Sequence, residues 1–174
     1  MEKKGIIIVF TGNGKGKTTA ALGIALRASG YGMKTLMIQF IKEKGKSGEH
    51  NVCPSLNENI DIQPFGMGFV FRGDDLRPHI AMAEEAWFLM EDALRVGNHH
   101  ILILDELSVV MNLGLLTMER VTEFLAKKPA DLHVIITGRD APEEIIRLAD
   151  VVTEMKEIKH IYQQGVKAIK GIDY

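Results

Sequence analysis

A run of glycines, lysines and threonines near the start of the chain has the composition of a phosphate-binding site. The apolar run from Ile6 to Phe10 is followed by the sequence GNGKGKTT, residues 12–19. Glycines let the backbone turn so that successive N–H groups point at an anion, and the dipole of a following helix adds to the attraction. The run predicts a P-loop, with Lys17 on the phosphates of a nucleotide and the Thr18 hydroxyl on magnesium.

The loop departs from the usual P-loop pattern at one position. Thr11 stands where GxxxxGK[ST] begins with glycine. A glycine-rich turn that binds no ligand is the alternative, but an apolar run before the loop and a helical pattern after it favour a nucleotide site. A P-loop alone does not choose between kinases, hydrolases, switches and transferases.

A second candidate site lies after another apolar run. Asp105 and Glu106 follow ILIL, where a P-loop protein ordinarily holds an acidic partner for magnesium. Two carboxylates at a solvated strand end are the simpler interpretation, but the P-loop favours a metal site. At this point a phosphotransferase and a regulatory ATPase both remain open.

The elements that must position these residues alternate along the chain. Apolar runs predict strands at 6–10, 33–41, 60–65, 100–105, 132–138 and 151–155, and helical spacing predicts helices at 17–30, 75–96, 117–128 and 142–150. The polar residues 42–51 are expected to form an exposed loop. Alternation of this kind predicts an α/β, P-loop mononucleotide-binding fold, with a mostly parallel sheet, helices on both faces and a single domain over residues 1–174.

Composition narrows the class of protein. The 174 residues are 46% hydrophobic with a formal net charge of -2, so no broad basic field for nucleic acid or a membrane surface is expected. The single cysteine, Cys53, excludes an internal disulfide and lies in a polar stretch without a visible base partner. The start of the chain has no apolar run long enough for a signal peptide or a membrane span, so we expect a cytoplasmic protein.

Several segments taken together are far more specific than the loop. They are TGNGKGKTTAALGIALRASGYG, IQFIK with GEHN after it, GMGFVF, LILDELSVVM, VIITGRDAPEEIIRLADVVTEM and KHIYQQGVKAIKGIDY. Over nearly the whole chain they resemble the P-loop type of ATP:corrinoid adenosyltransferase, which forms the cobalt–carbon bond of adenosylcobalamin. The resemblance implies that Thr11 belongs to a loop that binds ATP in the reversed direction.

The resemblance also implies the reaction and the residues that serve it. Co(I) of a reduced corrinoid attacks the 5′ carbon of ATP, and triphosphate leaves. Because no water or hydroxyl has to be deprotonated, Asp105 would hold magnesium through water rather than act as a base. Lys17, Thr18 and Glu106 are the expected catalytic residues, and Thr18, Asp105 and Glu106 the expected metal residues. The expected ATP contacts are Thr11, Gly12, Asn13, Gly14, Lys15, Gly16, Lys17, Thr18, Thr19, Arg27 and Arg139.

Two arginines in that set each have a simpler alternative. Arg27 matches a family arginine near the nucleotide, yet a solvated helix arginine would look the same. Arg139, in TGRD, follows a strand whose carboxyl end should face the nucleotide, but it could instead pair with Asp140 or Glu143.

The segment GMGFVF is expected to contact the corrinoid. Met67, Phe69 and Phe71 alternate along it, and in the family such aromatic residues lie near the lower face of the ring. Phe71 stands where the family often has tryptophan. Without the resemblance, an aromatic pair at this spacing would be read as ordinary core.

The resemblance further implies a homodimer and a flavodoxin-like reductant. The acceptor could be complete cobalamin, cobinamide or an earlier corrin intermediate. No nucleic-acid or membrane partner is expected.

Overall fold

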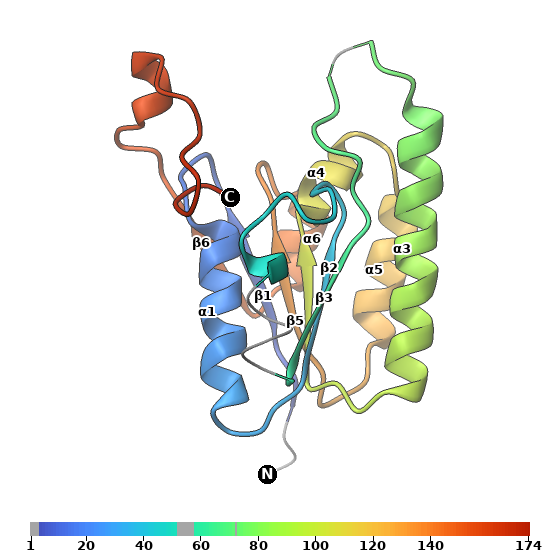
Figure 1. The fold of residues 1–174 in the computed structure, drawn as a ribbon. Coiled ribbons are helices and arrows are strands. Elements are labelled where there is room, and N and C mark those ends of the chain that lie inside the picture. Colours follow the sequence, from blue (N-terminus) through green and yellow to red (C-terminus); the bar gives the residue numbers. More distant parts are fainter. Residues whose placement is uncertain (1–3, 52–57, 72) are drawn as a thin grey trace.

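In a computed structural model, which describes residues 4–51, 58–71 and 73–174, the chain folds around one parallel sheet (Figure 1). Its described strands run in the order β3-β2-β4-β5-β1-β6, and every neighbouring pair is parallel. The bounds are β1 Ile7–Thr11, β2 Thr35–Gln39, β3 Ile60–Pro64, β4 Ile101–Asp105, β5 His133–Thr137 and β6 Val151–Glu154.

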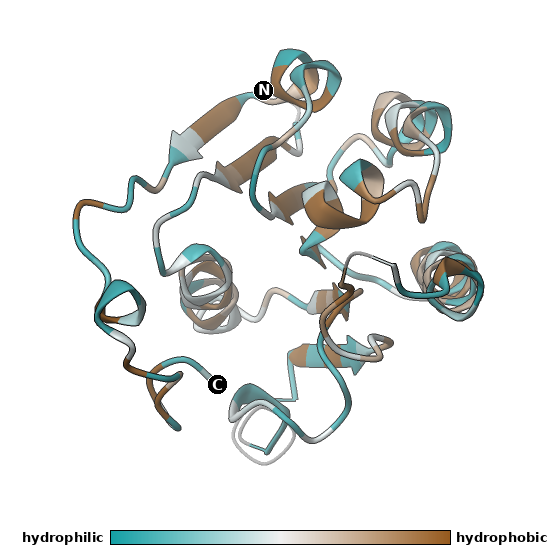
Figure 2. Cartoon of the chain, turned by 90° about the horizontal axis from the view of Figure 1, so that it is seen from above, coloured by the Kyte–Doolittle hydropathy of each residue, from teal (hydrophilic) through white to brown (hydrophobic). Residues whose placement is uncertain are grey.

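Helices cover both faces of the sheet, because each buried strand presents alternate side chains to the two sides. On β4, Leu102 and Leu104 belong to the larger core cluster, whereas Ile101 and Ile103 pack with α1 (Lys17–Ser29). The other face carries α3 (Leu76–Val96), α4 (Leu107–Asn112), α5 (Met118–Lys127) and α6 (Glu143–Leu148). Seen from above, the apolar strands lie between the two helical layers (Figure 2).

The predicted α/β class, the parallel sheet and the helices on both faces are therefore confirmed. Two local expectations need correction. The short helix α4 is not in the sequence prediction, because six residues, four of them buried, are too few to show a helical period. The segment 42–51 is not simply an exposed loop, since Ser47 is buried and the side chains of Glu49 and His50 face the sheet edge.

The carboxyl ends of the strands bring the candidate residues to one edge of the sheet. The glycine loop follows β1, Asp105 ends β4, and the turn containing Arg139 follows β5. Open parallel sheets bind ligands at this edge. Among the described residues, no helix is long and apolar enough to cross a membrane, and Cys53 lies outside those residues.

Candidate functional site

The glycine loop is tightly wound against the segment that follows β6. Gly12 and Gly16 have φ of 90° and 106°, in the left-handed region that side chains disfavour. A Cβ on Gly12 or on Gly14 would lie 2.6 Å from the Met155 carbonyl oxygen, which accepts a hydrogen bond from the Gly14 N–H at 2.6 Å. Glycine is therefore required both for the turn and for this close approach.

Lys17 lies inside the loop that it would use to hold phosphate. Its buried ammonium donates to the carbonyl oxygens of Gly12 and Gly14 at 2.7 and 2.9 Å. Burial lowers the pKa of Lys17, and the charge of Arg139 adds to that effect, while Glu106 and Asp105 oppose it. α1 begins at Lys17 after Gly16 without a side-chain cap, so its first N–H groups are directed at the loop and suit an anion.

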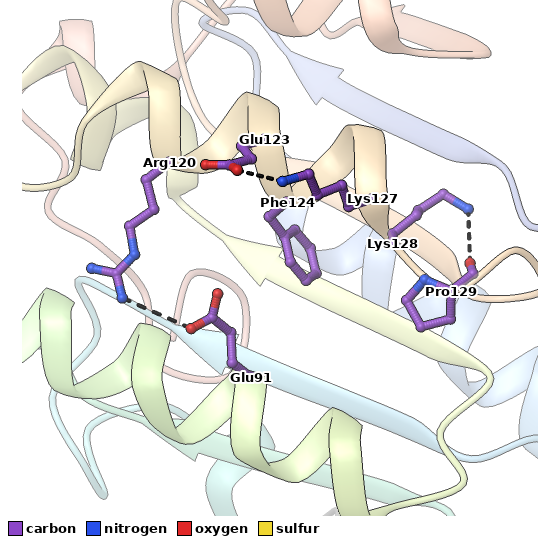
Figure 3. A pocket seen from close by; sticks show the side chains of 7 residues that line it. All are labelled: Glu91, Arg120, Glu123, Phe124, Lys127, Lys128 and Pro129. Carbon is purple, nitrogen blue, oxygen red and sulfur yellow. Dashed lines mark hydrogen bonds and ion pairs between the residues drawn. The ribbon is translucent and has the colours of Figure 1, made fainter.

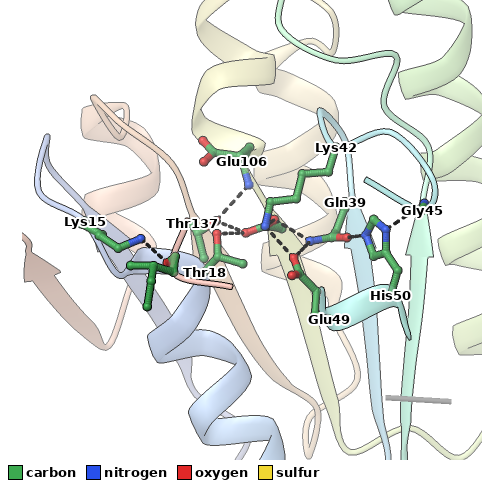
Figure 4. A network of polar contacts seen from close by, with 11 residues as sticks. Lys15, Thr18, Gln39, Lys42, Gly45, Glu49, His50, Glu106 and Thr137 are labelled. Atoms are coloured by element: carbon green, nitrogen blue, oxygen red, sulfur yellow. Dashed lines mark hydrogen bonds and ion pairs between the residues drawn. The ribbon is translucent and has the colours of Figure 1, made fainter. Parts of the chain in front are cut away.

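Asp105 is the centre of a polar network, part of which Figure 4 shows. Its carboxylate is fully buried, and Oδ1 accepts from the hydroxyls of Thr18 and Thr137, each at 2.8 Å. Oδ2 accepts from Gln39 Nε2 at 3.0 Å and lies 3.5 Å from Lys42 Nζ. Donors thus surround both oxygens of Asp105.

Glu106 differs from its neighbour in direction and in partners. Its backbone is left-handed, with φ of 62°, and its N–H donates to the Thr137 hydroxyl at 2.9 Å. In Figure 4 the Glu106 carboxylate points away from the labelled side chains of Thr18 and Gln39, and no hydrogen bond to it is found among the described residues. Burial, together with the charge of Asp105, raises the pKa of Glu106.

Four residues of this network have no role in the sequence prediction: Gln39, Lys42, Glu49 and His50. Lys42 Nζ lies 2.8 Å from Glu49 Oε1. Burial alone would lower the pKa of Lys42, but Asp105 and Glu49 raise it on balance. A signal was present, because QFIK, residues 39–42, spans the end of the predicted strand 33–41, at the edge where parallel sheets bind ligands.

Thr11, Arg139 and Arg27 differ in burial and in their position relative to the glycine loop. The buried hydroxyl of Thr11 accepts from the Ala141 N–H at 3.0 Å, which ties the loop to the turn after β5. Arg139 is exposed on that turn, and the ion pairs of the described residues do not include it, so the alternative pairing with Asp140 or Glu143 is wrong. Arg27 is exposed in the last turn of α1, about 15 Å along the helix from Lys17.

The structure therefore brings Arg139 to the loop but does not bring Arg27 there within the same chain. A contact of either arginine with ATP stays a prediction, as does a contact of Thr11. Of the remaining loop residues, Asn13, Lys15 and Thr19 are exposed.

The end of the chain folds back onto the loop. Lys15 Nζ lies 2.6 Å from Asp173 Oδ1 and donates to the Ile172 carbonyl oxygen at 2.6 Å. A Cβ on Gly48 would lie 4.0 Å from the backbone of Tyr174. The last residues thus lie between the glycine loop and the segment 42–51.

The expected corrinoid segment follows β3 on the same edge. The Gly66 and Gly68 N–H groups donate to the carbonyl oxygens of Lys42 and Ile41, so this segment packs on the one that carries Lys42. Met67, Phe69 and Phe71 are exposed by 51%, 81% and 69%. The alternative that the aromatic pair, Phe69 and Phe71, belongs to the core is wrong.

A groove of about 370 Å³ between α3 and α5 is a separate feature (Figure 3). Its cations are already paired: Arg120 with Glu84 and Glu91, and Lys127 with Glu123 at 2.5 Å. Lys128 donates to the carbonyl oxygens of Gly5 and Leu132. Since these charges are satisfied internally, the groove offers no free cation to an anionic ligand.

Comparison with known proteins identifies the family. The sequence profile of the family described as ATP:corrinoid adenosyltransferase BtuR/CobO/CobP matches residues 3–174. The chain belongs to the ATP:corrinoid adenosyltransferase family.

Curated members of the family agree over nearly the whole chain. The chain is 37% identical to the corrinoid adenosyltransferase of Pseudomonas aeruginosa over 99% of its own length and 85% of that relative. It is 40% identical to the Escherichia coli K12 enzyme and 39% identical to corrinoid adenosyltransferase CobA of Salmonella typhimurium, in each case over 99% of this chain and 87% of the relative. The family resemblance and the transferase activity expected from the sequence are confirmed.

Proposed function

We propose that the chain transfers the 5′-deoxyadenosyl group of ATP to the Co(I) centre of a reduced corrinoid, releasing triphosphate in the synthesis or salvage of adenosylcobalamin. The observation that carries the proposal is that the glycine loop before α1 and three exposed apolar side chains share one edge of the sheet. The segment 39–42 connects them, because it contacts both Asp105 and the backbone of Gly66.

The chemistry asks the protein to stabilise a leaving group. The electron pair of Co(I) forms the bond to C5′, the C5′–O bond breaks, and its electron pair leaves on the triphosphate oxygen. No proton needs to be removed. Lys17, Lys15 and the N–H groups at the start of α1 would stabilise the charge that accumulates on triphosphate. To do so, the Lys17 ammonium exchanges the carbonyl oxygens of Gly12 and Gly14 for phosphate oxygens.

The oxygen atoms at the site suit a magnesium ion. Mg²⁺ prefers hard oxygen ligands and keeps waters and substrate phosphates in its shell, so one or two protein ligands suffice. We propose Thr18 and Glu106 as those ligands, since the Glu106 carboxylate makes none of the described hydrogen bonds. Asp105, surrounded by donors, acts through Thr18 and water. Bound magnesium supplies positive charge to the phosphate oxygens.

The exposed segment supplies an apolar surface for the corrinoid. We propose that Met67, Phe69 and Phe71 cover the lower face of the ring, which favours loss of the axial ligand and eases reduction of Co(II) to Co(I). Exposure of two large aromatic side chains on one segment is typical of a binding surface.

The family resemblance supports further proposals. They are a single domain over residues 1–174, a homodimer, a flavodoxin-like reductant and a cytoplasmic location, with ATP contacts from Arg139 and Arg27. Arg27 is exposed and distant from the loop of its own chain, so its proposed contact with ATP would be made in another subunit.

An anaerobic assay with Mg-ATP and chemically reduced cob(I)alamin tests the function. We expect the light-sensitive spectrum of adenosylcobalamin and one intact triphosphate for each product formed. Release of ADP without a corrinoid product would overturn the proposal and indicate a phosphotransferase or an ATPase instead.

A further inference from the structure

We infer that Gln39 and Lys42 are positioning residues for the metal site, holding Asp105 in the orientation in which it accepts a hydrogen bond from the Thr18 hydroxyl. The inference rests on the proposed function, because it assigns Thr18 to the metal. It gives a role to the segment between β2 and residue 51.

Gln39 is fixed directly beside Asp105. It ends β2 and pairs in register with Asp105 at the end of β4, and its side chain is fully buried. Its Nε2 donates to Asp105 Oδ2 at 3.0 Å and to Glu49 Oε1 at 3.2 Å. One amide group therefore uses both of its protons on two carboxylates.

His50 fixes which way that amide faces. The Gly45 N–H donates to His50 Nδ1 at 3.0 Å, so the imidazole proton is on Nε2. This Nε2 lies 2.5 Å from Gln39 Oε1 and donates to it. With the oxygen facing His50, the amide nitrogen has to face Asp105, and a flipped amide would lose all three contacts.

Lys42 provides the second constraint, as Figure 4 shows. Its ammonium lies 2.8 Å from Glu49 and 3.5 Å from Asp105 Oδ2. Gln39 and Lys42 thus hold Oδ2, which leaves Oδ1 facing the hydroxyls of Thr18 and Thr137.

The consequence for the metal lies in the Thr18 hydroxyl. Because the Thr18 hydroxyl donates its hydrogen bond to Asp105, the Thr18 oxygen keeps its lone pairs for a cation. If the Asp105 carboxylate rotates, the Thr18 hydroxyl is no longer held in this orientation. Groups that orient a metal ligand typically affect metal affinity by about 10- to 100-fold.

The test measures metal binding without turnover. Mn²⁺ is titrated into protein saturated with inorganic tripolyphosphate and followed by electron paramagnetic resonance. In Gln39→Leu and Lys42→Met we expect the Mn²⁺ dissociation constant to rise about tenfold, whereas tripolyphosphate binding without metal stays within about twofold of the wild type. Lys42→Arg, which keeps the cation, should restore part of the affinity.

Gln63→Leu is the matched control, since Gln63 lies on neighbouring β3 and its side chain donates only to Asp61 among the described hydrogen bonds. Unchanged Mn²⁺ binding in both variants, with folding confirmed by their melting temperatures, overturns the inference and leaves the proposed function intact. If Gln39→Leu does not fold, Lys42→Met decides alone. A wild-type protein that does not retain Mn²⁺ with tripolyphosphate overturns the metal site, and the inference with it.

Discussion

At the scale of residues, two adjacent carboxylates have different environments. Asp105 ends a strand and is surrounded by four donors, whereas the left-handed backbone of Glu106 turns its carboxylate away from them. A buried carboxylate with this many donors is fixed, while one without them is available to a cation. The pair DE in the sequence shows that two acids are present, but not that donors surround Asp105 while none of the described hydrogen bonds reaches the Glu106 carboxylate.

Lys17→Ala is expected to reduce kcat/KM for ATP by about 10²- to 10³-fold, because it removes the buried cation that is proposed to stabilise the leaving group. The measurement is adenosylcobalamin formation from chemically supplied Co(I). Lys44→Ala, a change to an exposed lysine in the segment 42–51, serves as the control. Activity near the wild-type level in Lys17→Ala would remove Lys17 from the mechanism.

At the scale of elements, the segment after β3 combines a rigid start with an exposed end. Gly66 is pressed against the backbone of Ile41, whereas Phe69 and Phe71 extend into solvent. A fixed base lets exposed aromatic side chains present one surface to a ligand.

Phe71→Ala should slow the reaction more when it starts from Co(II) and a reductant than when Co(I) is supplied chemically, because the side chain is proposed to displace the lower axial ligand. The ratio of the two rates is the measurement. Since Phe71 is mostly exposed, the melting temperature should change little. Equal losses in the two assays would argue against the role in ligand displacement.

Two glycine substitutions should have opposite effects on stability. A Cβ on Gly66 would lie 1.9 Å from the Ile41 carbonyl carbon, so Gly66→Ala is expected to cost about 1–3 kcal/mol. Gly23 lies in the middle of α1 with nothing within 4 Å of a Cβ, so Gly23→Ala should add about 0.5–1 kcal/mol. Urea denaturation measures both, and a stable Gly66→Ala would contradict the observed packing.

Most of these elements are predictable from the sequence, because strands and long helices repeat over enough residues to show a period. The glycine loop and the DE pair are predictable for a different reason, because each is a run of neighbouring residues. Contacts between distant segments are not, as Lys15 with Asp173 and Gln39 with Asp105 show. Periodicity carries no information on which polar side chains meet across a sheet edge.

At the scale of the whole molecule, partly buried histidines make the free energy of unfolding depend on pH. His133 begins β5, and its Nδ1 accepts the Ile6 N–H at 3.3 Å, which requires a neutral ring. Burial lowers the pKa of His133, with the charge of Lys128 adding to the effect, and burial also lowers the pKa of His99. Both groups therefore bind protons more weakly in the folded state than in the unfolded chain.

The free energy of unfolding should accordingly fall in acid. The contribution of these histidines is fully present above the unfolded pKa of about 6.5 and is lost as the pH falls through the lower folded values, with a slope of at most about 1.4 kcal/mol per pH unit for each proton. His133→Gln should make the decline between pH 7.5 and 5 less steep in urea denaturation. His79→Gln, in the first turn of α3, is the control, and equal slopes in the wild type and His133→Gln would refute the assignment.

The position of Tyr174 has a practical consequence for handling the protein. Because residues 173 and 174 lie near Lys15 and Gly48, any peptide joined to Tyr174, such as a purification tag, would start beside the proposed nucleotide site. A tag placed there is expected to weaken ATP binding, and its proteolytic removal to restore it. Constants for ATP should therefore be measured on protein with no tag added after Tyr174.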